Sequence, residues 1–273
     1  MSKYSVRLSR TSGGFTLIEL LVVMGVIAVL AVLTLMSMRG IANDARLASA
    51  TNAVKAALDN ARALAMKNNT IVLVVFRPRL EGVHKQKQEV DIYTAKWTGE
   101  SILDLNGADV VDRFVPIPAI VVRTIPAGIK VAAPKYGSST GGINKDDVWI
   151  TQSHLPALDL GEDAGKLIAI MYGPDGTTIT HNSQSDSNTS FVDFDNDGSQ
   201  DISGDVNDQE DEDDEPFVAM APFLAVFDDD EAREIFDTTL WTDPDTRDGD
   251  LTEYITQFAK RIHFNRYTGV MMK

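Results

Sequence analysis

Five oxygen-bearing residues in the second half of the chain have the composition of a metal site. The segment DFDNDGSQD starts at residue 193 and has aspartates at its first, third, fifth and ninth positions and a glycine at its sixth. The candidate ligands are Asp193, Asp195, Asp197, Ser199 and Asp201, with Ser199 offering its main-chain carbonyl at the seventh position. Ca²⁺ prefers such oxygen ligands, and glycine at position six permits a sharp turn. The spacing therefore predicts a calcium loop.

This loop departs from a complete calcium-binding pattern at one place. Its twelfth position is Gly204 rather than glutamate, so a bidentate ligand would have to come from Asp205 or a nearby acid. The segment resembles the abbreviated calcium loops of dockerin-like and thrombospondin-type repeats more than a full EF-hand. A solvated acidic loop that binds no metal is the alternative. A second acidic segment, starting at Asp243, has the wrong spacing because Arg247 occupies its fifth position.

The candidate loop lies within a polar and acidic stretch, residues 180–215, which we interpret as an insertion. From Asp193 to Glu215 there are twelve acidic residues and no basic ones. Such a composition repels itself and does not bury enough apolar surface to fold unaided.

A second candidate for chemistry is a carboxylate in an apolar segment near the start of the chain. In GGFTLIELLVV, Glu19 follows Phe15 by one helical turn, and from Leu20 to Met38 the only polar side chains are Thr34 and Ser37. A carboxylate at the centre of a membrane span costs roughly 2.5 to 3.5 kcal/mol even on the most lenient scale. Some interaction must offset this cost.

The apolar segment is long enough to cross a bilayer. As a helix, residues 15–38 would span about 36 Å. The charged residues before Gly14 are all basic (Lys3, Arg7 and Arg10), which predicts that the chain after Arg39 lies on the outer side of the membrane. A cleavable secretory signal, a plain anchor and a buried helix of a soluble protein are alternatives, but none of them explains the glutamate.

The residues Gly14-Phe15-Thr16-Leu17-Ile18-Glu19, behind a basic leader and before an apolar helix, resemble the class III signal of type IV pilins and type II secretion pseudopilins. The resemblance implies that a prepilin peptidase cleaves after Gly14 and methylates the new amino group of Phe15. It also implies that Glu19 acts in assembly, by pairing with the N-terminus of a neighbouring subunit in a filament. In a low-dielectric environment such a pair would offset the cost of burying the carboxylate.

Three later segments resemble the minor pseudopilins of the H type and their fimbrial T relatives. The first is the alanine-rich segment from Ala45 into the run TIVLVV, and the second is LIAIMYGPDGTTIT, two strands with a Gly-Pro-Asp-Gly turn. The third is RIHFNRYTGVMMK, a strand followed by a glycine turn. This resemblance implies a pilin-like fold and, as partners, other pilins or pseudopilins and an inner-membrane assembly platform.

The hydrophobic periodicity predicts an α+β fold in which a long N-terminal helix packs on a mostly antiparallel sheet. Small and apolar residues at helical spacing extend the helix to about Lys67, where Asn68 and Asn69 end it. Beyond the three segments above, strands are predicted at 71–76, 89–94, 119–124, 128–133, 148–151 and 217–227. The predicted organisation is a leader (1–14), a transmembrane and filament-core helix (15–38), its periplasmic continuation (39–70) and a β-rich domain (71–273).

Composition and motifs exclude several classes of function. The net charge of −15 argues against nucleic acid as a partner, and the chain has no cysteine for disulfides or thiolate chemistry. GEDAGKL (161–167) has one residue too few between its glycines for a phosphate loop, and the four histidines, His84, His154, His181 and His263, form no metal motif. We therefore expect no enzyme.

The sequence leads to one main functional expectation and two alternatives. The main expectation is a non-enzymatic minor pseudopilin of a type II secretion pseudopilus, anchored in the bacterial inner membrane by a single span with its C-terminal domain in the periplasm. The alternatives are a minor type IV pilin and a membrane-anchored calcium-binding or adhesin module, in which Ca²⁺ would be the one cofactor. The sequence does not distinguish secretion, pilus and DNA-uptake machines.

Overall fold

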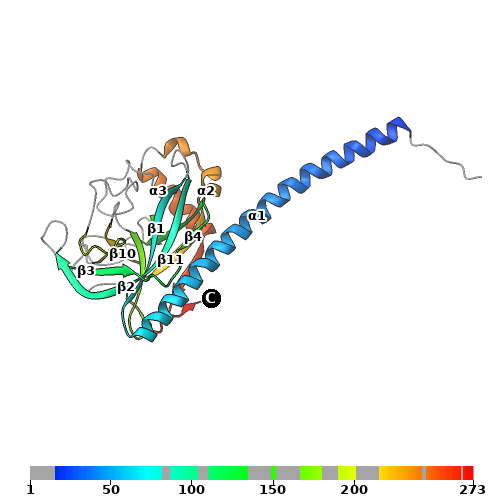
Figure 1. Ribbon diagram of the computed structural model, residues 1–273. Helices are drawn as coiled ribbons and strands as arrows, with labels where there is room; N and C mark the ends of the chain where they lie inside the picture. Colours follow the sequence, from blue (N-terminus) through cyan, green and yellow to red (C-terminus); the bar gives the residue numbers. More distant parts are fainter. Residues whose placement is uncertain are drawn as a thin grey trace, which may run out of the picture. The chain divides into compact units, whose positions relative to one another are not determined.

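The computed structural model describes residues 16–81, 87–103, 110–134, 149–151, 167–179, 190–200, 215–241, 244–265 and 267–272. Within these ranges the side chains of residues 32–41, 79–81, 87–88, 134, 149–151, 244–245 and 248 are not described. The chain divides into two units, residues 1–45 and 46–273. Figure 1 shows the helix α1, Leu17–Asn68, which passes through both units, and the β-rich remainder of the second unit.

The helix α1 ends where the sequence predicts. Its last residue is Asn68, and Asn69 adopts a left-handed conformation with φ of 50°, which asparagine tolerates better than most residues. The Thr70 amide donates to the carbonyl of Ala65 and closes the last turn. The chain then enters β1 (Val72–Glu81) directly.

The part of α1 in the second unit buries a narrow face of small side chains. Ala50, Val54, Ala61 and Ala65 are fully buried, and Leu58 is the one large side chain on this face that is fully buried. Alanine at these positions lets the helix backbone approach the strands closely while retaining high helix propensity. The predicted packing of an alanine-rich face on the sheet is therefore confirmed.

The first sheet has the strand order β10-β7-β1-β2-β3-β9, with β4 paired to β2 and β8 paired to β7. Its members, besides β1, are β2 (Lys87–Leu103), β3 (Val110–Pro116), β4 (Arg123–Ile125), β7 (Leu167–Tyr172), β8 (Thr178–Ile179), β9 (Ser190–Val192) and β10 (Val218–Met220). All pairs are antiparallel except β10 with β7 and β3 with β9. The predicted mostly antiparallel sheet is confirmed.

Both faces of the first sheet are buried. Val72, Val74 and Phe76 of β1 point into the core that α1 covers, whereas Leu73 and Val75 point into a second apolar cluster. This alternation follows from the two-residue period of a strand. The sheet also curls, because a bridge between Phe191 and Phe217 joins β9 and β10, the strands at the two ends of its order.

The second sheet has the order β13-β12-β11-β5-β6. Its strands are β5 (Ile129–Pro134), β6 (Trp149–Thr151), β11 (Phe223–Asp228), β12 (Lys260–Phe264) and β13 (Met271–Met272). Leu224 and Val226 of β11 face the core under α1, whereas Ala225 and Phe227 face a third cluster. This sheet therefore lies between α1 and a separate helical layer.

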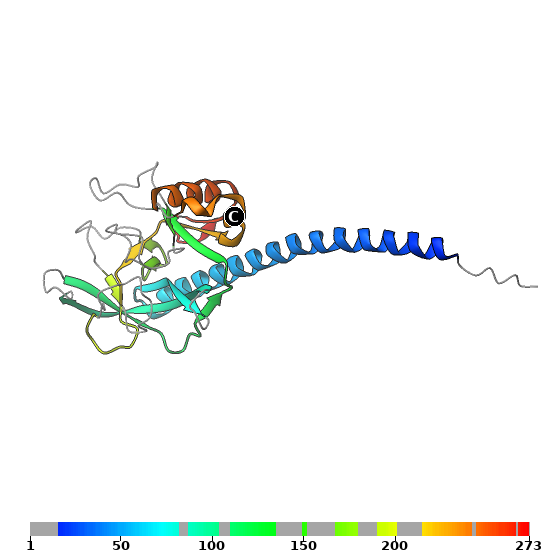
Figure 2. The same cartoon turned by 90° about the horizontal axis from the view of Figure 1, so that it is seen from above.

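That helical layer consists of α2 (Asp229–Ile235), the short 3₁₀ helix η1 (Thr238–Leu240) and α3 (Pro244–Phe258), drawn in orange in Figure 2. These helices were not predicted from the sequence. The local signals for α3 are a proline at its first helical position and the apolar residues Leu251, Tyr254 and Ile255.

Two of the predicted strands differ from the structure, and some observed strands were not predicted. The strand expected at 119–124 begins only at Arg123, because Ile117–Ile120 forms a turn. The strand expected at 217–227 is divided by Pro222 into β10 and β11, which belong to different sheets. The strands β3 and β9 were not predicted.

Arg62 of α1 brings together the three segments on which the H-type resemblance rests. Its Nε donates to the carbonyl of Gly176 in the Gly-Pro-Asp-Gly turn, at 3.1 Å, and to the carbonyl of Thr268 in the C-terminal glycine turn, at 3.0 Å. Gly269 adopts φ of 64°, and a Cβ there would overlap the carbonyl oxygen of Gly176. The helix α1 and both turns therefore meet at one contact, which we call the joint.

We expect Gly269→Ala to destabilise the protein by roughly 2 to 5 kcal/mol, because the new methyl group meets backbone and the left-handed conformation disfavours any side chain. Gly249→Ala in α3 is the matched control: nothing lies within 4 Å of its added Cβ, and alanine favours a helix. Urea unfolding of both variants measures the difference. Equal stability of the two variants would contradict this account of the joint.

Lys130 of β5 is a buried cation on the helical side of the second sheet. Its side chain is 3% exposed, and burial lowers its pKa to about 8, although the attraction of Asp229 partly opposes this shift. At pH 9 the unfolded chain therefore binds a proton that the folded chain does not. The free energy of unfolding therefore rises as the pH increases from about 8 towards 10.5, the ordinary pKa of lysine.

Between pH 7.5 and 9.5 we expect the free energy of unfolding of the natural protein to rise by about 2 kcal/mol relative to Lys130→Met, which lacks the titrating group. Urea unfolding at the two pH values provides the measurement. If both proteins show the same pH dependence, the buried lysine does not titrate as described.

Candidate functional site

The helix α1 begins with a reciprocal pair of hydrogen bonds between Thr16 and Glu19. The Glu19 carboxylate accepts from the Thr16 amide at 2.9 Å and from the Thr16 hydroxyl at 2.8 Å, and the Glu19 amide donates to that hydroxyl at 3.3 Å. This is a capping box, in which threonine and glutamate three residues apart satisfy amide groups that a helix start leaves without partners. Gly14 and Phe15 lie outside the described residues.

The capping box gives Glu19 a role that the sequence analysis missed. The signal was available, because threonine followed three residues later by glutamate before an apolar run is typical of a helix start. The Glu19 carboxylate remains exposed in the single chain. It can therefore cap its own helix and still accept a further donor.

The large apolar side chains of α1 from Leu17 to Leu30 are exposed on every side of the helix. Their exposed fractions range from 49% at Val23 to 83% at Leu17 among the large residues. Within the part of the chain that the structure describes, no helix combines the length and the apolar character needed to cross a membrane. Phe15 and the side chains of residues 32–38, which belong to the predicted span, lie outside that part.

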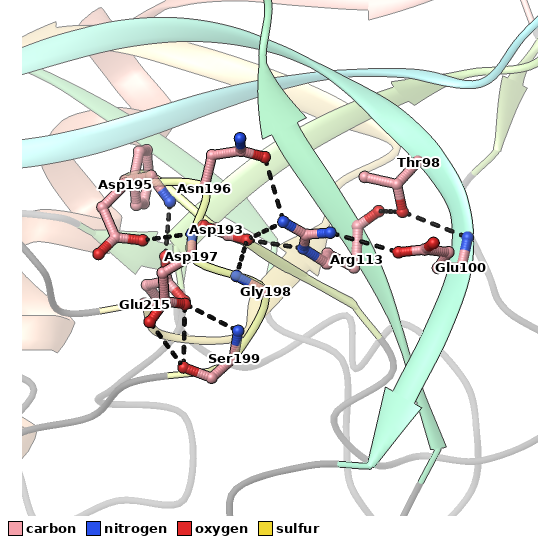
Figure 3. Close-up of polar contacts among 11 residues, drawn as sticks. Thr98, Glu100, Arg113, Asp193, Asp195, Asn196, Asp197, Gly198, Ser199 and Glu215 are labelled. Atoms are coloured by element: carbon pink, nitrogen blue, oxygen red, sulfur yellow. Dashed lines mark hydrogen bonds and ion pairs between the residues drawn. The ribbon is translucent and has the colours of Figure 1, made fainter.

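The predicted calcium loop starts where β9 ends. The amide of Asp193 donates to the carbonyl of Phe114 on β3, so the first ligand position continues the strand ladder. Asp193 is fully buried, and its Oδ2 accepts from Arg113 Nε at 2.6 Å and from the Gly198 amide at 3.1 Å (Figure 3). Its Oδ1 is buried without a hydrogen-bond partner among the described residues.

The next ligand positions fold the loop back on itself. Asp195 accepts from the Asp197 amide at 3.0 Å, and Asp197 accepts from the Ser199 amide at 2.8 Å and from the Ser199 hydroxyl. Gly198 adopts φ of 97°, as the predicted turn requires. Asp195 and Asp197 are exposed, whereas Asp193 is buried.

The loop brings three of the predicted ligands together. One carboxylate oxygen from each of Asp193, Asp195 and Asp197 lies within 4.8 Å of the other two. Ser199 donates hydrogen bonds from its amide and its hydroxyl to the Asp197 carboxylate. Asp201, the remaining predicted ligand, and the acids considered for the twelfth position lie outside the described residues.

The pKa values of the two exposed carboxylates of the cluster shift in opposite directions. A hydrogen bond from the Asp197 amide lowers the pKa of Asp195, but partial desolvation and the carboxylates of Asp197 and Asp193 together raise it, and the net pKa shift is upward. The hydrogen bonds from Ser199 lower the pKa of Asp197. The carboxylates of Asp193, Asp195 and Asp197 therefore make the centre of the loop negative.

Two residues that the sequence analysis missed hold this loop in place. Arg113 of β3 pairs with Asp193, donates to the Glu100 carboxylate at 3.3 Å, and donates to the Asn196 side-chain oxygen at 3.1 Å. Glu215, only 1% exposed, accepts from the Phe194 amide at 2.6 Å. Neither was recognisable in the sequence, because β3 was not predicted and Glu215 is one of many acids in its tract.

The loop is thus part of the folded domain rather than of a wholly solvated insertion. Residues 190–192 pair with β3, and the buried Gln200 donates to the carbonyl of Glu215 at 3.2 Å. The second acidic segment forms α3 from Pro244 onward, which is not a metal loop; its first residue, Asp243, lies outside the described residues.

Among the residues that the structure describes, the remaining weak candidates form no catalytic arrangement. His263 stacks on Phe223 with ring centroids 5.0 Å apart, which is a packing role. His84, His154 and His181, together with most of the segment 161–167, lie outside the described residues. Leu167, the last residue of that segment, begins β7.

Comparison with known proteins identifies the N-terminal segment. Residues 9–35 match the family described as the prokaryotic N-terminal methylation motif. No curated protein and no solved structure matches the chain. The matched segment contains Gly14, Phe15 and the capping box of Thr16 and Glu19.

Proteins with this motif are structural rather than enzymatic, and the motif implies processing by a prepilin peptidase, assembly with other pilins and membrane anchoring. The chain therefore carries a type IV pilin-like prepilin signal on an α+β fold consistent with that of pilins.

Proposed function

We propose that this protein is a minor pseudopilin of the H type, a structural subunit of a type II secretion pseudopilus. The observation that carries this proposal is the methylation motif at residues 9–35, which includes the exposed apolar start of α1. Prepilin peptidase cleaves after Gly14 and methylates Phe15. The subunit is stored in the bacterial inner membrane through one span, with its domain in the periplasm.

The assignment to the H type is supported by the joint around Arg62. The alanine-rich helix, the Gly-Pro-Asp-Gly turn and the C-terminal glycine turn are the segments that resemble H-type subunits, and Arg62 hydrogen-bonds both turns. A contact between segments 114 and 206 residues apart indicates that they work as one unit. A minor type IV pilin with the same helix remains the nearest alternative.

In this proposal the apolar surface of α1 is covered first by lipid and then by neighbouring subunits. Helix residues from Leu17 to Leu30 supply the contact surface, and the inner-membrane assembly platform moves the subunit from one environment to the other. Glu19 sets the register, because its carboxylate can accept from the methylated amino group of a neighbour. An ion pair in low dielectric favours one axial position over its alternatives.

A second candidate is a membrane-anchored calcium-binding or adhesin module in which the filament is incidental. The observation that favours it is the cluster of Asp193, Asp195 and Asp197. The two functions differ in what Glu19 does: a filament subunit needs its carboxylate, whereas an anchored module needs only the apolar helix. Substitutions at Glu19 therefore distinguish them.

We expect Glu19→Gln to leave cleavage intact but to reduce recovery of the protein with other pseudopilins at least tenfold, because the neutral amide cannot form an ion pair with an ammonium group. Thr16→Val is the matched control, since it removes the hydroxyl of the capping box and keeps the carboxylate. Cross-linking in cells followed by co-purification provides the measurement.

Two outcomes would contradict the assembly role of Glu19. Full co-purification of Glu19→Gln would show that the charge is dispensable. An equal loss in Glu19→Gln and Thr16→Val would show that the glutamate acts only as a helix cap.

A further inference from the structure

Asp193, at the first position of the aspartate loop, has a buried carboxylate oxygen that no described residue contacts by a hydrogen bond. Asp193 is fully buried, and two donors, Arg113 and the Gly198 amide, occupy its Oδ2. Its Oδ1 has no hydrogen-bond partner among the residues that the structure describes. A buried carboxylate oxygen without a partner is costly, and buried charges in proteins are normally paired or bound to metal.

The surroundings of this oxygen are negative. Carboxylate oxygens of Asp195 and Asp197 lie within 4.8 Å of the Asp193 ligand atom and of each other. Across the described ranges of the chain, Arg113 is the one cationic side chain that pairs with a member of this cluster, and it is shared with Glu100. Three carboxylates therefore converge with less than one full compensating charge.

The spacing of these oxygens suits one cation. Ca²⁺ binds oxygen ligands at about 2.3 to 2.6 Å, so two ligands on opposite sides of the ion are separated by about twice that distance. All three separations are below 4.8 Å and therefore lie within this limit. Mg²⁺ usually keeps several waters and is held by one or two carboxylates, so a site with three carboxylates and a carbonyl favours calcium.

We propose that the loop from Asp193 to Ser199 binds one calcium ion through carboxylate oxygens of Asp193, Asp195 and Asp197 and the main-chain carbonyl of Ser199. Water completes the coordination. The buried Oδ1 of Asp193 thereby gains its partner, while Oδ2 keeps its contacts with Arg113 and Gly198. This site is independent of the assembly role proposed above.

The position of the loop gives the calcium ion a structural consequence. Asp193 directly follows β9, and Glu215, which accepts from the Phe194 amide, directly precedes the segment that leads into β10. β9 and β10 are the two end strands of the first sheet, joined by the bridge between Phe191 and Phe217. Calcium at the loop would hold the sheet closed at this junction.

The test is a calcium titration of the full chain in detergent micelles after removal of metal with EDTA. We expect one site with a Kd on the order of 10⁻⁴ to 10⁻³ M or tighter, as in extracellular calcium modules, and at least tenfold weaker binding of Mg²⁺. Calorimetry gives both affinities. Calcium should also slow amide hydrogen exchange in 190–200 and 215–220.

Variants at exposed positions separate ligation from folding. Asp195→Asn and Asp197→Asn should each weaken calcium binding at least tenfold. Asp237→Asn is the matched control, because Asp237 is exposed and accepts from the amide and hydroxyl of Thr239 as Asp197 does from Ser199. It should bind calcium as the natural protein does.

In EDTA, Asp195→Asn should melt at or above the temperature of the natural protein, because it relieves repulsion among the carboxylates. A metal-free variant that melts lower would indicate a purely structural aspartate and overturn the proposal. The proposal also fails if calcium up to about 10 mM produces no binding signal, if Mg²⁺ binds equally well, or if Asp237→Asn loses calcium binding as Asp197→Asn does.

Discussion

An apolar helix surface that the chain itself does not cover is the constraint on which the rest of this protein depends. Large side chains from Leu17 to Leu30 are about half or more exposed, and at roughly 25 cal/mol per Å² such a surface is costly in water. Lipid or the helices of other subunits must cover it. A prepilin signal at residues 9–35 is consistent with both environments in turn.

The second unit is built to hold the other half of the same helix. Alanines from Ala50 to Ala65 allow close packing on a core to which both sheets contribute, and Arg62 ties the helix to two distant turns. The first sheet is buried on both faces and curls until β9 meets β10. The aspartate loop lies at the junction of the two end strands.

Structural features that neighbouring residues determine could be predicted from the sequence, whereas contacts between distant segments could not. The end of α1 at Asn68, the start of β1 and the turn before Thr177 follow from asparagine, β-branched and Gly-Pro-Asp-Gly chemistry. The spacing of Asp193, Asp195 and Asp197 also predicted their convergence. The strand β9 has three residues and pairs in parallel with β3, far away in the chain, so nothing local marks it. The strand β3 was also not predicted. Arg113 was missed for that reason, since its partner is 80 residues away.

The central claim, that the chain is a processed pilin-like subunit, is tested most directly by the mass of its N-terminal peptide, measured in cells with and without a prepilin peptidase. The account predicts a peptide that begins at Phe15 and is heavier by one methyl group when the peptidase is present, and an intact leader when it is absent. A leader that persists in the presence of the peptidase, or a cut beyond Met38, would contradict it.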